Sequence, residues 1–117
     1  MPRLISEPTR IPVPGGKIIS EHVGRVNTGS ETVSVAHMIA PAHWGEPFQT
    51  PEFDEITLVL AGSVIVDHVG GPTTALAGQS ILTSAGERIR YSCGAAGAEY
   101  VAVCLPAFGP ETVNREA

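Results

Sequence analysis

The chain has 117 residues, of which 43% are hydrophobic and 16% are charged, so its length and composition suit one folded domain. Seven Lys and Arg residues against twelve Asp and Glu residues give a net charge of −5, and Lys17 is the only lysine. Because nucleic-acid binders need a basic stripe, this balance argues against nucleic acid as a partner. Residues 1–10 lack a signal peptide's apolar core and no run approaches the roughly 20 apolar residues of a membrane span, which predicts a cytoplasmic protein without a membrane partner.

The predicted elements are short, because thirteen glycines and ten prolines interrupt the chain and no segment keeps a helical apolar period. This pattern predicts an all-β sandwich or barrel. The expected strands are Lys17–Val23, Thr32–Ala40, Glu55–Ala61, Ser63–Asp67, Thr73–Ala77, Ser80–Thr83, Arg88–Cys93 and Glu99–Leu105. A short helix is a candidate from Pro110 onwards, with that proline at its first position. The two cysteines are too few for a disulfide framework, so we expect buried thiols.

The strand Glu55–Ala61 is apolar on both faces. One face carries Glu55, Thr57, Val59 and Ala61, and the other carries Ile56, Leu58 and Leu60. A strand of this kind must be covered on both sides, by a second sheet or by another subunit. A chain of this size has little to spare for that cover, so we expect a homodimer.

Two segments concentrate residues with chemistry. The first runs from Pro41 to Gly62 and contains the only tryptophan, a histidine and several carboxylates. The second, residues 78–91, reads as a strand, a turn and a strand, and it ends with two arginines and a tyrosine. These segments resemble the two motifs of a single-domain cupin. Glu55, six residues and Gly62 match the end of the first motif, and Gly78 and Gly86 match the start of the second, with Ser84 in the usual proline place.

The resemblance implies a cupin-type antiparallel jelly-roll barrel, a single domain over residues 1–117 whose motif-bearing core spans about 32–108. The metal ligands of the family are nearly all replaced. The first-motif histidines fall at Phe48 and Thr50, or at Gln49 and Pro51, and the second-motif histidine falls at Ile89. One remaining carboxylate cannot hold a transition metal that normally takes three or four protein ligands, so we predict no metal and no cofactor. A substitute site remains an alternative, from His43, Glu46, Gln49 and Glu55.

Acid and base side chains are expected to take the place of the metal. In the cupin pattern, Glu55 and Thr57 share the inward face of one strand, and Ile89 and Tyr91 share that of another. His43 comes just before the first motif, at the barrel rim, and Lys17 lies on the first strand. These residue types abstract protons beside a carbonyl and stabilise the resulting enolate. The predicted catalytic residues are therefore His43 as base, with Tyr91, Glu55 and Lys17.

Among cupins, the chain is similar to the small metal-independent dehydratases of uridyl peptide antibiotic pathways. Lys17, His43 and Tyr91 match catalytic residues of that family, whereas a further active-site tyrosine is replaced by Thr57. The resemblance implies a lyase or isomerase, dehydratase-like, that acts on a small polar metabolite such as a hydroxy-carbonyl compound. The expected substrate contacts are Trp44, Glu46, Gln49, Thr57 and Arg90. The alternatives are a non-catalytic small-molecule or sugar-binding cupin, and a metallo-cupin with non-standard ligands.

Overall fold

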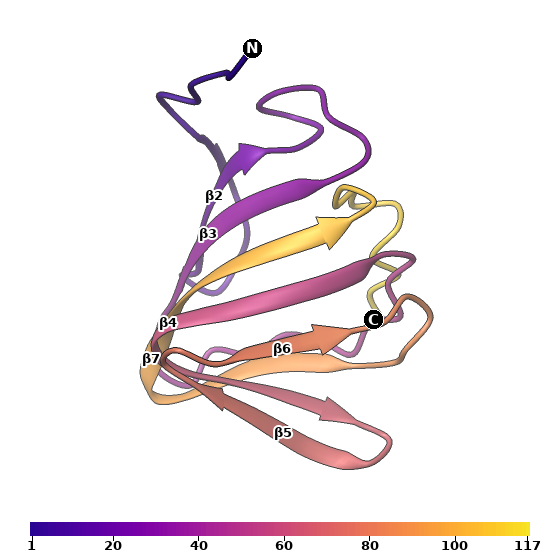
Figure 1. Cartoon of the computed structure of the whole chain (residues 1–117). Helices are drawn as coiled ribbons and strands as arrows, with labels where there is room; N and C mark the ends of the chain where they lie inside the picture. Colours follow the sequence, from indigo (N-terminus) through magenta and orange to yellow (C-terminus); the bar gives the residue numbers. More distant parts are fainter.

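The computed structural model describes all 117 residues. It contains one antiparallel sheet of seven strands and no helix (Figure 1). Alternating buried and exposed side chains and the many glycine and proline turns favour these strands over helices. The structure contains no helix long and apolar enough to cross a membrane. The strands are β1 (Thr9–Ile11), β2 (Ile18–Val23), β3 (Ser34–Ala40), β4 (Asp54–His68), β5 (Gly71–Leu76), β6 (Ser80–Thr83) and β7 (Arg90–Leu105).

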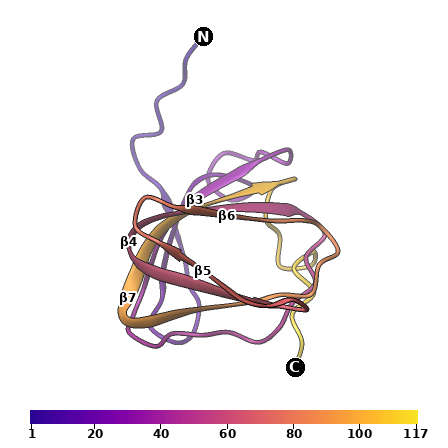
Figure 2. The same cartoon turned by 60° about the horizontal axis from the view of Figure 1, so that its bottom comes forward.

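The sheet follows the order β1-β2-β3-β7-β4-β5, and β6 pairs with β4 outside this path. The last strand, β7, therefore lies between β3 and β4, as its position in Figure 1 shows. A view turned towards one end shows β4, β5, β6 and β7 curving into a barrel outline from which the N-terminal segment extends away (Figure 2).

Strands β4 and β7 are long and bent, and each serves both halves of the barrel. Their pairing runs from Asp54 opposite Leu105 to Asp67 opposite Arg90, with register shifts on either side of Gly62. Gly62 has a φ of 73°, and a Cβ there would lie 2.1 Å from the carbonyl oxygen of Gly97. Only glycine permits this close approach, which lets one continuous strand turn the corner of the barrel.

The barrel interior holds the core. A cluster of twelve buried residues includes Val59, Val64, Ile89 and Tyr100, and a second cluster is formed by Phe53, Cys104 and Val113. Both cysteines are free and buried, as predicted. On β4 the alternation is also as predicted, since residues 57 and 59 are buried whereas residues 56, 58 and 60 are 38–47% exposed. The homodimer that would cover this outer face stays a prediction.

The structure corrects three details of the expected elements. The pairs of strands predicted over 55–67 and 88–105 are continuous strands, because bulges carry β4 past Gly62 and β7 continues through Gly94 and Gly97. Strand β1 was not predicted. The predicted C-terminal helix is wrong: after Pro110 the chain makes one turn, with the Thr112 amide donating to the Gly109 carbonyl, and then reaches a positive φ at Asn114 that a helix does not accommodate.

Candidate functional site

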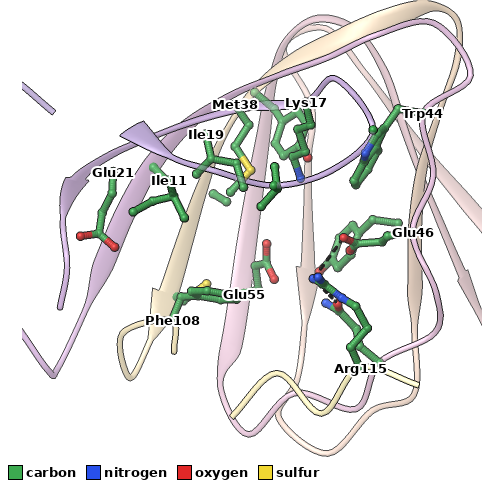
Figure 3. Close-up of a pocket in the computed structure, with 18 of the residues that line it drawn as sticks. Ile11, Lys17, Ile19, Glu21, Met38, Trp44, Glu46, Glu55, Phe108 and Arg115 are labelled. Atoms are coloured by element: carbon green, nitrogen blue, oxygen red, sulfur yellow. Dashed lines mark hydrogen bonds and ion pairs between the residues drawn. The ribbon is translucent and has the colours of Figure 1, made fainter. Parts of the chain in front are cut away.

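The main cavity opens within the barrel and has a volume of about 440 Å³. Its walls come from the segment before β2, the strands β2, β3, β4 and β7, the loop between β3 and β4, and the C-terminal tail (Figure 3). Apolar side chains form one part of the lining, and a group of ionisable side chains forms another. The ionisable side chains include Lys17, Glu46, Glu55, Tyr91, Tyr100 and Arg115.

Lys17 rests against two aromatic rings. It follows the Pro14–Gly16 turn at the start of β2, and its Nζ lies 4.0 Å from the centroid of Trp44 and 5.3 Å from that of Tyr100. Trp44 is 8% exposed and Tyr100 is 3% exposed. Burial lowers the pKa of the Lys17 ammonium, and the nearby carboxylates Glu46 and Glu55 oppose this change. The ammonium is therefore held chiefly by ring faces and by more distant charge.

Glu46 and Arg115 pair at the mouth of the cavity, as the dashed contact in Figure 3 marks. Nη2 of Arg115 lies 3.2 Å from a carboxylate oxygen of Glu46 and donates to Oε1 of Gln49 at 3.3 Å. Burial raises the pKa of Glu46, and Lys17 and Arg115 oppose the rise. The C-terminal tail thus supplies a cation to a site otherwise built from residues that precede it in the chain.

Glu55 projects from β4 into the middle of the cavity (Figure 3). Burial raises its pKa to about 7; Lys17 opposes the rise, Glu46 adds to it, and hydrogen bonding to the Tyr91 phenol opposes it. The Tyr91 hydroxyl also shares a hydrogen bond of 3.0 Å with Thr83, and burial followed by the Glu55 charge raises its pKa. Near neutral pH Glu55 is therefore present both as an acid and as a base, beside a phenol that stays protonated.

The structure places the predicted catalytic residues in two separate hollows. Lys17, Glu55 and Tyr91 line the same cavity. His43 does not: it is exposed, has a φ of 58° and borders a separate, shallower hollow outside the barrel. The expectation that His43 faces Tyr91 across one cavity is wrong, because the left-handed backbone at this turn directs its side chain away from the interior.

The predicted substrate contacts are divided too. Trp44, Glu46 and Gln49 line the cavity. Arg90 lies outside, where it pairs with Asp67 at 3.0 Å and stacks on Phe48. Thr57 is 1% exposed and outside the cavity lining, and its hydroxyl has no hydrogen-bond partner. Thr57 and Arg90 are thus misplaced as contacts, because one is sealed in the wall and the other belongs to the outer surface.

No group of three or more His, Cys, Asp or Glu side chains is gathered closely enough to hold a metal ion. The alternative metal site required His43 together with Glu46, Gln49 and Glu55. Its carboxylates and amide line the cavity, whereas the histidine lies in the outer hollow. The structure therefore does not assemble that ligand set.

Solved structures share this architecture. An oxalate decarboxylase variant from Bacillus subtilis superposes with a TM-score of 0.79 at 17% identity, over 95% of this chain and 31% of that one. The fold is a cupin jelly roll. EutQ, an ethanolamine utilization protein of Salmonella typhimurium, matches with a TM-score of 0.62 at 26% identity, over 79% of this chain and 71% of that one. The cupin resemblance is thereby confirmed for the fold, while no family model matches the chain.

A curated relative points to a different activity. The chain is 42% identical over 107 residues, 91% of its length, to a Myxococcus xanthus protein named Endoribonuclease YbeY. The chain spans about a third of that relative, 36% of its length. This finding contradicts the predicted lyase, isomerase or dehydratase, and with it the small metabolite as partner and the exclusion of nucleic acid. A net charge of −5 describes the whole chain and does not show which side chains meet in one cavity, where Lys17 and Arg115 lie among Glu21, Glu46 and Glu55.

Tyr100 is a site residue that sequence reasoning missed, and so is Arg115. Sixty-nine residues separate it from Glu46, so no local motif connects them. The sequence offered only a weak signal for Arg115, which is an arginine in the turn-rich segment that follows the last predicted strand.

Proposed function

We propose that this chain acts in RNA metabolism and that its barrel cavity holds one unstacked nucleotide of a single-stranded RNA. The relative named as an endoribonuclease supports the class of partner, although the chain matches only 36% of that protein. The name of that relative describes the longer protein, so the role proposed for this chain is recognition of the RNA in its cavity.

The aromatic wall suits a base. Single-stranded RNA is commonly recognised through bases that leave the stack and pack on aromatic side chains, each worth about 1–3 kcal/mol. Trp44 and Tyr100 both line the cavity, and because the Lys17 ammonium lies against both rings, a base would stack there by displacing it. Its volume of about 440 Å³ falls among the pockets of about 300–1,000 Å³ that take organic ligands.

The charged groups suit the rest of a nucleotide. Lys17 and Arg115 supply cations for a phosphate, and an arginine fork can bind phosphate oxygens in pairs. Glu46, Glu55 and the Gln49 amide accept hydrogen bonds, as the exocyclic amino groups of bases require. Arg115 already pairs with Glu46, so a phosphate would compete with that carboxylate.

One observation carries the proposal. In a chain of net charge −5, a stacking surface and two cations meet in the same hollow, with Lys17 directly over the ring of Trp44. This combination is what a nucleotide requires of its site.

The test uses Trp44, the only tryptophan, as the probe. We expect short single-stranded oligoribonucleotides to change its fluorescence at low salt, with affinity that falls as salt rises. Arg115→Gln should weaken binding about tenfold, whereas Arg3→Gln, which removes an equal charge from an exposed position outside the cavity, should not. Unchanged fluorescence with oligomers of all four bases, or equal effects of the two substitutions, would refute the proposal.

Cleavage of RNA in the same cavity is a second candidate, favoured by the pKa of about 7 for Glu55. As carboxylate, Glu55 would take the proton of a ribose 2′-hydroxyl while that oxygen forms a bond to phosphorus. The bond from phosphorus to the 5′-oxygen breaks, and the leaving oxygen takes a proton from the Lys17 ammonium. The products are a 2′,3′-cyclic phosphate and a free 5′-hydroxyl.

Mass spectrometry of RNA fragments checks this candidate. Glu55→Gln should lower cleavage about a hundredfold or more while the Trp44 fluorescence response to RNA persists. Cleavage that survives the substitution unchanged would assign it to another group. Binding without any cleavage by the unaltered chain would refute the second candidate and leave the first standing.

A further inference from the structure

Lys17 is unusual among the charged residues of the chain in the way it is held. The ion pairs of the structure use His37, Arg88, Arg90 and Arg115, and none uses Lys17. Its amine makes no hydrogen bond to another residue, and it lies against the faces of Trp44 and Tyr100. An amine held by ring faces keeps its lone pair, once deprotonated, free to react.

Burial of Lys17 raises the share of its neutral amine, while the two ring faces stabilise the ammonium. Burial is the largest influence and lowers its pKa; among the facing charges, Arg115 lowers it further, while Glu46, Glu55 and Cys93 raise it. A neutral amine is the nucleophilic form, and lysines activated by desolvation are the ones that react with carbonyl groups.

We propose that Lys17 is a nucleophilic lysine that binds aldehydes covalently as a Schiff base in the barrel cavity. The Nζ lone pair attacks the carbonyl carbon, and the carbonyl π electrons move to oxygen. A proton passes from nitrogen to that oxygen and gives a carbinolamine. Loss of water then leaves a C=N bond. No oxidant or reductant is consumed.

Glu55 is placed to assist the loss of water. It lines the same cavity and interacts with the Lys17 charge, and its pKa of about 7 makes the protonated acid available at neutral pH. The acid gives its proton to the leaving hydroxyl, and the carboxylate so formed stands near the iminium cation. The apolar lining beside this pair favours an aldehyde with an apolar body, since Ile19, Met38 and Phe108 contribute to the wall (Figure 3).

This inference does not depend on binding of RNA, because it concerns the amine and its immediate neighbours. The two proposals have separate measurements, fluorescence of Trp44 for RNA and covalent labelling of Lys17 for aldehydes. Failure of one leaves the other intact.

The experiment is reductive alkylation with propanal and cyanoborohydride at pH 7, followed by peptide mass spectrometry. Reductive alkylation modifies primary amines, and Lys17 is the only lysine. The exposed α-amine of Met1 is the other primary amine, and it serves as the internal reference. We expect the labelling of Lys17 relative to Met1 to be higher in the folded chain than in urea, by about tenfold for each pKa unit lost on folding. A ratio that is equal or lower in the folded chain would overturn the proposal.

Lys17→Arg is the matched variant, because it keeps the cation against the rings and removes the primary amine. It should lose the internal label, retain labelling of Met1 at the same rate and keep the circular dichroism of the unaltered chain. Internal labelling that persists in this variant would overturn the assignment to Lys17. The rate ratio in the unaltered chain decides the proposal even if the variant fails to fold.

Discussion

Glu55→Gln tests the electrostatics of the cavity through the stability of the fold. Burial raises the pKa of Glu55 from 4.5 to about 7, so the folded chain binds this proton more tightly than the unfolded chain does. The stabilising effect of the proton is fully present below pH 4.5 and is lost as pH rises towards 7. The difference corresponds to about 3 kcal/mol, because each pKa unit is worth about 1.4 kcal/mol.

Glutamine keeps nearly the same shape and stays neutral throughout this range. Glu55 is half-buried, and this partial exposure weakens the effect of burial, so we expect a loss of between about 1 and 3 kcal/mol for the unaltered chain relative to Glu55→Gln between pH 4.5 and pH 7. The measurement is the free energy of unfolding from urea titrations at several pH values. Glu7→Gln, which removes an exposed carboxylate, is the control. A difference between the unaltered chain and Glu55→Gln that does not vary with pH would refute the placement of this carboxyl.

Two further predictions concern the barrel wall. Thr57→Val should leave stability unchanged or raise it by about 1 kcal/mol, because it removes a buried hydroxyl without a partner. Thr83→Val should cost about 1–2 kcal/mol, because it removes the hydrogen bond between Thr83 and the buried Tyr91 phenol. Urea unfolding compares them, and a larger loss for Thr57→Val would contradict the contacts. Gly62→Ala should cost at least about 3 kcal/mol or prevent folding, because its Cβ would lie 2.1 Å from a carbonyl oxygen. Gly78 has a similar φ but open space around it, so Gly78→Ala should cost only about 1–2 kcal/mol. Equal losses at the two glycines in thermal unfolding would show that the corner of β4 is not as tight as described.

Much of the barrel followed from period-two alternation and turn residues. The strand Ser80–Thr83 has the predicted bounds, and the inward side of β4 is the predicted one. The cupin resemblance placed Glu55 and Tyr91 on inward faces, and both line the cavity. The long strands were divided in two because a glycine has the same signature at a bulge as at a turn.

The site was harder to predict because it combines distant segments. His43 precedes a cupin motif, yet one left-handed residue is enough to direct its side chain outward, and sequence does not fix that angle for a histidine. Arg115 enters the cavity only because the tail folds back beside Gln49. The exclusion of nucleic acid relied on total charge, which does not show where individual cations and carboxylates lie.

The place of β7 in the sheet has a consequence for how the chain is made. During synthesis β3 and β4 emerge first, but in the finished sheet β7 lies between them, pairing Ala36 with Ala102 on one side and Thr57 with Ala102 on the other. Until residues 90–105 leave the ribosome, two strand edges lie open and the walls of the cavity have no common strand. Pairings this far apart in sequence are intrinsically slow to form. The nascent chain is thus exposed to edge-to-edge aggregation for most of its synthesis, and the interval ends only when a late strand is inserted between two early ones.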